Sequence, residues 1–557
     1  MERRLSEFFT GETARLAGLT AQEGVGDPLI TGLEYDSRKI QPGGLYFALP
    51  GLHTDGHRYI ADAAARGAAV IVHEAETGEK APGVVYLKVQ SSRFAMSPIA
   101  ASFYGFPSRR LTVIGVTGTE GKSTVVYLIY QLLRLMGEKA GFFSTVQYSD
   151  GGEPRWNPEH QTTPEAPAVQ RMLWEMADNG CRYAVAEASS HGLSAKTNRL
   201  GDVEFGAAVF TNVTHEHLEF HGTWEQYRDD KANLFRALDK SPGLDKNPGL
   251  DRYAQLDAAE ESGKAAPFGV ISADDKSADY FARATTQRTV RFSARGRDAD
   301  MVLKAIESGE WGNWYDVFIT AENDSIDIRD RLPGAFNAGN VMAALLTVSN
   351  LLNIPIRKIA PLTIHLKPVR GRMTAIDKGQ PFELVVDYAH TPSSFQTIFP
   401  PLRKRLDKTG GRIISLFGSA GERDTQKRGE QGKIAALYSD IIILTDEDPR
   451  GEKPEDILEE IAQGCETDQG CETDQGCETD QGCAKFKRGE NLFLIPNRPA
   501  AIRKALSLAE KGDLVLLLGK GHENSIIYAD KTMPYDEIVE TEKALGEMNK
   551  ITDRHYL

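Results

Sequence analysis

The stretch LTVIGVTGTEGKSTVVYLIYQLLRLMG, residues 111–137, decides the fold of the central part of this chain. Its beginning, LTVIGVT, is a short apolar run rich in β-branched residues, which is typical of a buried strand. A glycine-containing loop follows, and from Ser123 onward apolar residues recur at helical spacing. A strand, a glycine loop and a helix in this order predict a phosphate-binding loop, because backbone N–H groups and the helix N-terminus attract phosphate there.

The side chains of this loop suit a nucleotide with its metal ion. Lys122 supplies a positive charge, and Ser123 or Thr124 beside it offers a hydroxyl for Mg²⁺. The strict pattern G-x-x-x-x-G-K-[ST] requires glycine where Val116 stands, so the match is partial. A glycine turn without a ligand is the alternative, but the flanking strand and helix favour ATP. The expected ATP contacts in this loop are Gly118, Thr119, Glu120, Gly121, Lys122, Ser123 and Thr124.

Length and composition narrow the class of protein. At roughly 150 residues per domain, 557 residues predict two to four domains. The chain has 65 Lys and Arg against 79 Asp and Glu, and its net charge of −14 has the wrong sign for binding nucleic acid. It contains no run of 18 apolar residues, and its N-terminal sequence is not that of a secretory signal. We therefore expect a cytoplasmic protein that neither inserts into membranes nor binds nucleic acid.

The α/β pattern continues on both sides of the loop. RYAVAE, GAAVFTNV and FGVIS read as strands separated by helix-length segments, which predicts a mostly parallel sheet with helices on both faces. Short apolar runs precede this region, and a second series, from FELVVDYAH to DLVLLLGKG, follows it. We predict three α/β domains, residues 1–108, 109–366 and 367–557.

Two polar segments interrupt these domains. PGLD occurs at 242–245 and again at 248–251, and CETDQG occurs three times in tandem from Cys465. The four cysteines of the second segment, Cys465, Cys471, Cys477 and Cys483, are six residues apart, which fits neither a zinc site nor a disulfide framework. Both segments are predicted to be surface insertions.

Several motifs accompany the loop in a fixed order. EASSHGL (187–193), TNVTHEHLEFHG (211–222), FNAGN (336–340) and DYAHTP (387–392), together with the loop, resemble the Mur ligases. Within that family the chain is similar to the tripeptide synthetases, on the segments YDSRKIQPGGLYFALPG (35–51), TTP (162–164), GERDTQKR (421–428), DEDPRGE (446–452) and GKGHE (519–523). The resemblance implies an ATP-dependent amide ligase that joins a diamino acid to UDP-N-acetylmuramoyl-L-alanyl-D-glutamate through an acyl phosphate, in peptidoglycan precursor synthesis.

The resemblance also implies a role for each domain. The first would bind the UDP end of the substrate, the central one would be P-loop ATPase-like, and the last would be Rossmann-like and bind the amino acid. It assigns Mg²⁺ to Ser123, Glu187 and His217, and it identifies Lys231 as a lysine that becomes carbamylated to hold a second Mg²⁺. Lys122, His217 and Lys231 are thus the expected catalytic residues. From spacing alone, Lys231 reads as an ordinary surface lysine.

The remaining assignments also come from the resemblance. The expected contacts to the UDP-muramoyl-dipeptide are Ser37, Arg38, Thr162, Thr163, Ser189 and Arg199, with Lys196 as the alternative to Arg199. Further ATP contacts are expected from Asn337, Asn340, Arg372, Asp387 and His390. Because these ATP contacts lie in two predicted domains, the site requires the C-terminal domain to close on the central one.

The identity of the added amino acid is less determined by the sequence. The expected pocket residues are Arg423, Asp448, Arg450, Gly519 and Glu523. Relatives that use meso-diaminopimelate carry DNPR where this chain has Glu447-Asp448-Pro449-Arg450. The arginine favours a distal carboxylate, whereas the aspartate suits the distal ammonium of lysine or ornithine. We favour meso-diaminopimelate and keep L-lysine and L-ornithine open.

Two other functions compete with this interpretation. A folylpolyglutamate synthetase shares the phosphate loop but would lack the N-terminal DSRKIQPGGLYFALPG segment and the EDPR stretch, both present here. A nucleotide-binding scaffold without catalysis would not need the complete set of Lys122, Glu187, His217 and Lys231. The sequence thus favours a ligase similar to the Mur tripeptide synthetases. We expect this ligase to be a monomer.

Overall fold

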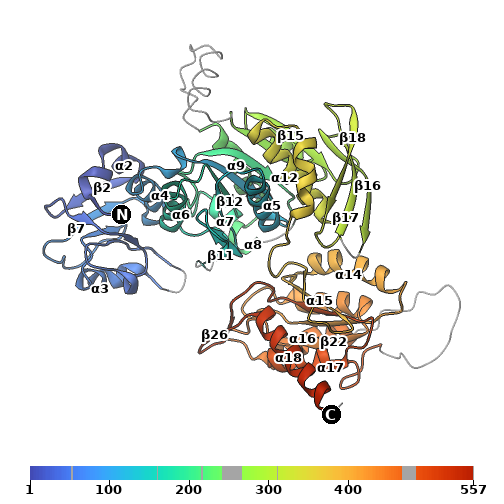
Figure 1. Cartoon of the computed structure of the whole chain (residues 1–557). Helices are drawn as coiled ribbons and strands as arrows, with labels where there is room; N and C mark the ends of the chain where they lie inside the picture. The colour runs from blue at the N-terminus through green and yellow to red at the C-terminus, as the bar shows by residue number, and fades with distance from the viewer. Residues whose placement is uncertain are drawn as a thin grey trace. The chain divides into compact units, whose positions relative to one another are not determined.

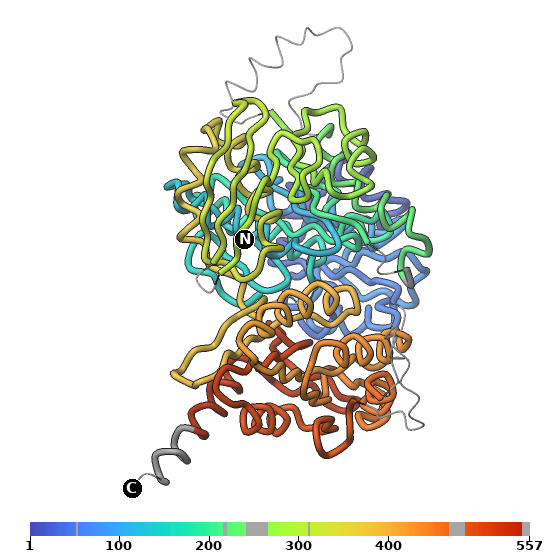
Figure 2. The backbone as a smooth tube through the Cα atoms, turned by 90° about the vertical axis from the view of Figure 1, so that its right-hand side faces the viewer, coloured from blue at the N-terminus to red at the C-terminus, as the bar shows by residue number. Residues whose placement is uncertain are grey.

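The computed structural model describes residues 1–51, 54–157, 159, 161–214, 218–240, 266–309, 312–466 and 485–555. Contacts between residues divide the chain into two compact units, Met1–Lys367 and Pro368–Leu557. Figure 2 allows both to be followed by colour, the second unit running from yellow-orange to red.

The N-terminal part of the first unit is a small sheet with strand order β2-β7-β6-β5-β4. Its strands from β7 to β4 are parallel, and β2 is antiparallel to β7. The strands are β2 (Leu19–Glu23), β4 (Leu33–Glu34), β5 (Leu45–Phe47), β6 (Val70–His73) and β7 (Val85–Val89), beside the pair β1 (Arg3–Arg4) and β3 (Leu29–Ile30). The accompanying helices are α1 (Leu5–Phe8), α2 (Gly11–Leu16), α3 (Ile60–Ala65) and α4 (Ser92–Phe103).

A larger mixed sheet forms the rest of the first unit (Figure 1). Its order is β11-β10-β9-β12-β8-β13-β14-β15-β16-β17-β18. The strands are β8 (Thr112–Thr117), β9 (Ala140–Phe143), β10 (Gln147–Ser149), β11 (Arg155–Trp156), β12 (Tyr183–Glu187), β13 (Phe205–Phe210), β14 (Phe268–Ser272), β15 (Arg288–Ser293), β16 (Met301–Gly309), β17 (Gly312–Ile319) and β18 (Asp324–Asp330). The strands from β9 to β16 are parallel, whereas β10, β11, β17 and β18 are joined antiparallel at the two ends.

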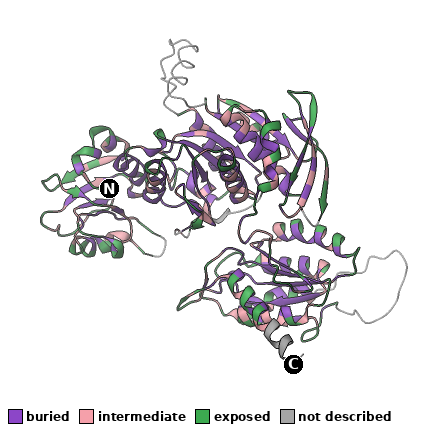
Figure 3. Cartoon of the chain, viewed as in Figure 1, coloured by how far each residue is buried: buried purple, intermediate pink, exposed green. Residues whose placement is uncertain are grey.

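Helices cover both faces of this sheet, which explains why β8 is buried along its whole length (Figure 3). On one face Ile114 and Val116 pack with α5 and α12, and on the other Val113 packs with α6 and α9. The helices are α5 (Lys122–Leu135), α6 (Ala166–Asp178), α7 (Ser190–Leu193), α8 (Leu218–His221), α9 (Trp224–Leu238), α11 (Ala278–Ala282), α12 (Asn337–Leu352) and α13 (Ile356–Ile359). The continuous apolar run at 111–117 is therefore a central parallel strand.

The second unit has one main sheet, with order β19-β20-β24-β21-β22-β23. Its strands are β19 (Thr374–Ala375), β20 (Glu383–Asp387), β21 (Ile413–Phe417), β22 (Ile441–Leu444), β23 (Leu492–Leu494) and β24 (Leu514–Leu518), and β25 (Ser525–Ile527) pairs with β26 (Thr532–Pro534). Apart from the antiparallel β19, the strands of the main sheet are parallel. One face packs against α14 (Pro392–Leu406), α15 (Gln426–Tyr438) and α16 (Pro454–Glu466), and the other against α17 (Arg498–Leu508) and α18 (Glu537–His555).

The predicted fold class is confirmed: both units are α/β, with mostly parallel sheets flanked by helices. One expectation needs correction. Cys465, the first residue of the CETDQG repeat, is buried in the last turn of α16, so it belongs to the core and not to a surface insertion. The other repeat cysteines and both PGLD segments lie outside the described residues. No single described helix is long and apolar enough to cross a membrane; α12 and residues 356–365, a bent pair, pass that test only jointly.

A buried ion pair ties the second unit together. The Arg498 guanidinium donates from Nε and Nη2 to the two carboxylate oxygens of Glu537, at 2.8 and 2.7 Å. It also donates to the carbonyl oxygens of Asp446, at 3.0 Å, and Leu518, at 2.7 Å. Both side chains are fully buried. Arg498 thus connects the end of β24 and the segment after β22, two strands separated by β21, to the last helix, α18.

Arg498→Met should destabilise the protein strongly, because it leaves the Glu537 carboxylate buried without its cation. We expect the free energy of unfolding to fall by about 3–5 kcal/mol, measured by urea titration of the full chain. Arg498→Met combined with Glu537→Leu should recover part of this loss. A double variant no more stable than Arg498→Met would contradict the explanation.

Shortening the repeat by two copies, through deletion of residues 471–482, should leave folding and activity unchanged. The deletion keeps Cys465 in the core and Glu466, which accepts a hydrogen bond from Arg488 at 2.7 Å. Thermal unfolding and turnover of the shortened chain test this. As the matched comparison, Cys465→Asp in the full-length chain should destabilise it by burying a charge.

Candidate functional site

The loop after β8 lies so close to two other segments that only glycine fits. Gly118 has a φ of +156°, and a Cβ there would lie 2.0 Å from Thr211 Oγ1. Gly121 has a φ of +81°, caps the N-terminus of α5, and a Cβ there would lie 2.7 Å from Asn340 Oδ1. The two glycines therefore bring the loop against β13 and α12.

Hydrogen bonds accepted by Asn212 hold the loop in shape. The N–H of Thr119 donates to the Asn212 carbonyl at 2.8 Å, and the N–H of Glu120 donates to Asn212 Oδ1 at 2.9 Å. Lys122 bends back over the loop, with Nζ donating to the Thr119 carbonyl at 2.8 Å. The first turn of α5, which includes Ser123, is left to offer its N–H groups to an anion.

Glu187, the last residue of β12, lies next to the start of α5 because β12 pairs with β8. Its carboxylate is buried and accepts hydrogen bonds from Ser123 Oγ at 2.8 Å, from the Thr145 N–H at 2.9 Å and from Thr145 Oγ1 at 3.1 Å. Thr124 follows Ser123 in the same turn of α5. Sequence analysis found Ser123 and Glu187 but missed Thr145. These oxygen atoms are of the kind that Mg²⁺ prefers.

Lys231 is buried, contrary to what its spacing on a helix suggests. It lies on α9 with only 1% of its surface exposed, and Nζ donates to the Gly118 carbonyl at 2.6 Å. Nζ also lies 4.4 Å from the centre of the Tyr227 ring. The structure therefore brings Lys231 to the phosphate loop. His217 and His215 lie outside the described residues, and within those residues no cluster of three His, Cys, Asp or Glu could hold a metal.

A second group of candidates meets behind Glu187. Thr163 Oγ1 donates to the Glu187 carbonyl at 2.8 Å and accepts from the Ser189 N–H at 2.9 Å. Arg199 Nη1 donates to the Thr163 carbonyl at 2.9 Å, and its Nη2 donates to Glu165 at 2.8 Å. Thr162 precedes this group in the chain. Lys196 instead donates to the carbonyl of Phe220 at 3.0 Å, so of the two alternatives Arg199 is the one bonded to Thr163.

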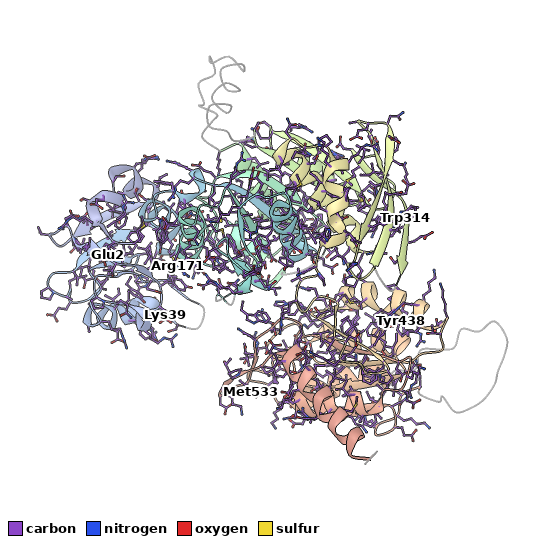
Figure 4. All side chains as sticks on the ribbon, in the orientation of Figure 1. Glu2, Lys39, Arg171, Trp314, Tyr438 and Met533 are labelled. Carbon is purple, nitrogen blue, oxygen red and sulfur yellow. The ribbon has the colours of Figure 1, made fainter. Side chains whose placement is uncertain are left out.

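The two candidate residues near the N-terminus, Ser37 and Arg38, differ in solvent exposure. Ser37 is buried at the start of a short 3-10 helix, whereas the side chain of Arg38 is 83% exposed and donates to Asp36 at 2.9 and 2.8 Å. A cavity of about 420 Å³ lies beside this turn, lined among others by Tyr35, Lys39, Arg171 and Trp174. Figure 4 labels Lys39 and Arg171, two residues that line this cavity. Ser37 and Arg38 do not line it.

The asparagines at the start of α12 lie beside the loop. Asn340 Nδ2 donates to Asn337 Oδ1 at 2.9 Å, and Asn337 Nδ2 donates to the Pro333 carbonyl at 2.8 Å. Asn340 Oδ1 occupies the space next to Gly121. The structure therefore brings both asparagines together with the phosphate loop, within the first unit.

In the second unit, Asp387, Arg372 and His390 gather around Tyr388. The Asp387 carboxylate accepts from the N–H groups of Met373 and Ala389, both at 2.7 Å, and burial raises its pKa. The Arg372 guanidinium lies 4.6 Å from the centre of the Tyr388 ring, and His390 Nδ1 lies 2.9 Å from the Tyr388 carbonyl oxygen.

The candidate amino-acid pocket contains a buried cation that sequence analysis missed. The fully buried Lys520 ammonium donates to Asp448 Oδ1 at 2.8 Å and also to Glu523. The Asp448 carboxylate accepts a further bond from the Ile527 N–H at 2.9 Å. Burial raises the pKa of Glu523, although the Lys520 charge acts in the opposite direction. Two expected acidic residues are thus already bound to one lysine.

The other expected pocket residues surround this group unevenly. Gly519 has a φ of +100°, and a Cβ there would lie 3.2 Å from Glu447 Oε2, a buried oxygen without a partner among the described residues. Arg450 adopts a φ of +55°, and its buried Nε also lacks a partner in the part of the chain that the structure describes. Arg423 is exposed on the loop before α15. Gly519 and the Nε of Arg450 are therefore enclosed by the protein, whereas Arg423 lies at the surface.

Comparison with known proteins identifies the family of this chain. The chain matches the model of the Mur ligase middle domain over residues 116–244 and 250–348, the Mur ligase glutamate ligase domain over 371–521, and the Mur ligase family catalytic domain over 29–104. UDP-N-acetylmuramyl-tripeptide synthetase of Treponema denticola is 49% identical, covering 93% of this chain and 94% of the relative. A UDP-N-acetylmuramoyl-L-alanyl-D-glutamate--2,6-diaminopimelate ligase of Caldanaerobacter subterraneus subsp. tengcongensis is 33% identical, covering 94% and 96%.

Solved structures show the same fold. A UDP-N-acetylmuramoyl-L-alanyl-D-glutamate--2,6-diaminopimelate ligase aligns with a TM-score of 0.55 and 25% identity, covering 93% of this chain and 95% of that one. The MurF ligase of Thermotoga maritima in complex with ADP aligns with a TM-score of 0.57 and 19% identity, covering 92% and 96%. This chain belongs to the Mur ligase family, as an ATP-dependent ligase that adds amino acids in peptidoglycan precursor synthesis.

Proposed function

We propose that this ligase joins a diamino acid to the D-glutamate of UDP-N-acetylmuramoyl-L-alanyl-D-glutamate, releasing ADP and phosphate. The observation that carries the proposal is the buried Lys231, whose ammonium is bound to the carbonyl of Gly118 in the phosphate loop. A buried lysine at this point is suited to a reaction on phosphoryl groups. The reaction would activate the substrate carboxylate as an acyl phosphate, which the incoming amine attacks.

The phosphate loop would position ATP for the first step. The N–H groups of the first turn of α5 and the Lys122 ammonium would bind the phosphate oxygens, and Lys122 would move from the Thr119 carbonyl to do so. The oxygen atoms of Ser123 and Glu187 would hold Mg²⁺, with His217 and carbamylated Lys231 as further ligands. Bound Mg²⁺ neutralises phosphate charge.

Three residues behind Glu187 would hold the acceptor substrate. Thr163, Ser189 and Arg199 already form one hydrogen-bonded group, so their polar atoms are fixed before the substrate arrives. Thr162 would add a hydroxyl beside them. Ser37 and Arg38 would contact the UDP end near the start of the chain. Such pre-ordering reduces the entropy lost when the reacting groups are aligned.

The rest of the ATP site is proposed to assemble from both units. Asn337 and Asn340 would contact ATP beside the loop, and Arg372, Asp387 and His390 would contribute from the second unit. Closing the second unit on the first would exclude water from the acyl phosphate, which hydrolyses readily. A monomer working in the cytoplasm, with no nucleic acid and no membrane insertion, remains our prediction.

The favoured amino acid is meso-diaminopimelate, with Arg450 pairing its distal carboxylate and with Asp448, Gly519, Glu523 and Arg423 around it. L-lysine or L-ornithine is the second candidate. The negative charge of Asp448 supports lysine or ornithine only weakly, because the Lys520 ammonium is already bound to the Asp448 carboxylate. Two acids around one lysine still leave one negative charge in the pocket, which suits a distal ammonium.

The proposal is tested by phosphate release from the purified protein with ATP, Mg²⁺ and UDP-N-acetylmuramoyl-L-alanyl-D-glutamate. meso-Diaminopimelate, L-lysine and L-ornithine are supplied in separate reactions, and the product mass is determined. We expect turnover that requires both the acceptor and one diamino acid. Absence of turnover with all of them, despite ATP binding, would instead support the scaffold function.

Lys231→Ala should remove most of the ligation, by about 100-fold or more in kcat, because a charged group that acts on the phosphates is lost. A short carboxylic acid added to the assay should restore part of the activity, since it can replace the carbamate. Lys240→Ala, an exposed lysine just after the same helix, is the matched control. Equal turnover in both variants would refute the role of Lys231.

Arg450→Ala should weaken the use of meso-diaminopimelate more than that of L-lysine. The guanidinium can pair only with a distal carboxylate, so we expect KM to rise for the first substrate by about 10-fold and little for the second. Arg405→Ala, which removes an exposed ion pair with Glu383, serves as the control. An equal effect of Arg450→Ala on both amino acids would count against carboxylate pairing.

A further inference from the structure

Three buried polar side chains form a chain of hydrogen bonds beside the candidate site. His221 Nδ1 lies 2.7 Å from Asp230 Oδ2, and His221 Nε2 lies 3.0 Å from Ser190 Oγ. Asp230 Oδ1 accepts a further bond from Gln226 Nε2 at 3.0 Å. All three side chains are almost completely buried. The Asp230 carboxylate accepts the hydrogen bond from His221 Nδ1–H, and Nε2 is hydrogen-bonded to the Ser190 hydroxyl.

The chain of hydrogen bonds links the segments that carry the candidate site residues. Ser190 begins α7 and directly follows Ser189, which caps that helix. Asp230 directly precedes Lys231 on α9. His221 ends α8 and lies between these two helices. The imidazole is therefore one connection between the substrate-side segment and the helix of Lys231, beside the hydrogen bond that Asn233 Nδ2 on α9 donates to the Leu193 carbonyl on α7 at 3.0 Å.

A second route leads from His221 to Lys231 through an aromatic ring. The His221 ring packs edge to face against Tyr227, with 5.1 Å between the ring centres. The Lys231 ammonium lies 4.4 Å from the centre of the same tyrosine ring. Tyr227 also approaches the phosphate loop, its hydroxyl being 3.1 Å from Thr119 Oγ1. Moving the imidazole would therefore disturb Tyr227 and, with it, the position of Lys231.

The same three residue types occur in hydrolases, where serine attacks a carbonyl group. That role does not fit here. Ser190 is only 2% exposed, so no substrate carbonyl can reach its hydroxyl, which is hydrogen-bonded to His221. The arrangement instead resembles the way a carboxylate orients a histidine in other sites. His221 can therefore affect the reaction only by positioning the residues it bonds, Ser190 and Asp230.

We propose that His221 is a positioning residue, which sets the distance between Ser189 and Lys231 by bonding Ser190 on one side and Asp230 on the other. This inference rests on the proposed function, because it assumes that Lys231 is carbamylated and that Ser189 contacts the substrate. Without the imidazole, α9 keeps its fold but Lys231 shifts relative to the substrate-side segment. A displacement of about 1 Å can reduce a rate by about 100-fold.

The test uses the full chain with His221→Phe, which fills the space of the ring but makes neither hydrogen bond. Asp230→Asn is the conservative variant. The asparagine Oδ1 can still accept the hydrogen bond from His221, and a flip of the Gln226 side-chain amide lets Gln226 Oε1 accept from the asparagine Nδ2. Asp229→Asn is the matched control on the same helix; Asp229 pairs with Arg236 at 2.5 Å instead of with His221. We measure three quantities for each variant: turnover, KM for ATP, and the NMR resonance of the carbamate after labelling with ¹³C-bicarbonate. The thermal unfolding temperature shows whether the variant is folded.

We expect His221→Phe to lower kcat by about 10- to 100-fold and to weaken the carbamate resonance, with KM for ATP changed less than about threefold. Asp230→Asn should retain most of both signals, and Asp229→Asn should retain all. If His221→Phe does not fold, Ser190→Ala becomes the test of the proposal, because it removes only the hydrogen bond between Ser190 and His221. We expect this variant to have a lower kcat and to keep the carbamate.

A kcat and a carbamate resonance in folded His221→Phe equal to those of the unsubstituted protein would overturn the proposal. So would equal losses in His221→Phe and Asp229→Asn, since these would reflect a general effect on α9. The proposed function can fail separately. If the unsubstituted protein shows no ligation at all, the carbamate resonance still reports whether His221 positions Lys231.

Discussion

The close approach of the phosphate loop to β13 and α12 is the constraint on which the first unit depends. Because Gly118 and Gly121 have no side chains, Thr211 and Asn340 can lie directly against the loop. That contact lets the carbonyl of Gly118 reach Lys231 on α9 and places Asn337 with Asn340 beside the start of α5. Residues more than 200 positions apart in the sequence thus meet at one turn. A side chain at either glycine would separate them.

Burial of charge organises the second unit in a similar way. Arg498 satisfies Glu537 and two strand-end carbonyls, and Lys520 satisfies Asp448 and Glu523. Removing Arg498 would leave the fully buried Glu537 carboxylate without its cation, and removing Lys520 would leave the mostly buried Asp448 unpaired; either loss is more costly than losing an exposed ion pair. The acidic side chains that follow the carboxyl ends of the parallel strands are therefore held by internal cations.

Much of the fold could be predicted because its signals are local: the strand, glycine loop and helix at 111–137 are adjacent in sequence, and the apolar runs mark parallel strands. The site was only partly accessible to such reasoning. Lys231 reads as a surface residue by helical spacing, and only the family resemblance pointed to it. Thr145, Asn212 and Lys520 were missed because their roles arise from contacts made across the sheet or between distant strand ends. Arg38, in contrast, has the expected motif but points to solvent.

The end of α16 makes the protein tolerant of changes in the number of repeat copies. The helix closes with Cys465 and Glu466, the first two residues of a CETDQG unit, and the core accepts that cysteine. Every unit begins with the same two residues, so a chain with one whole unit more or fewer would again place cysteine and glutamate at these positions. As long as one unit remains, the final turn of α16 keeps the same sequence whatever the number of copies.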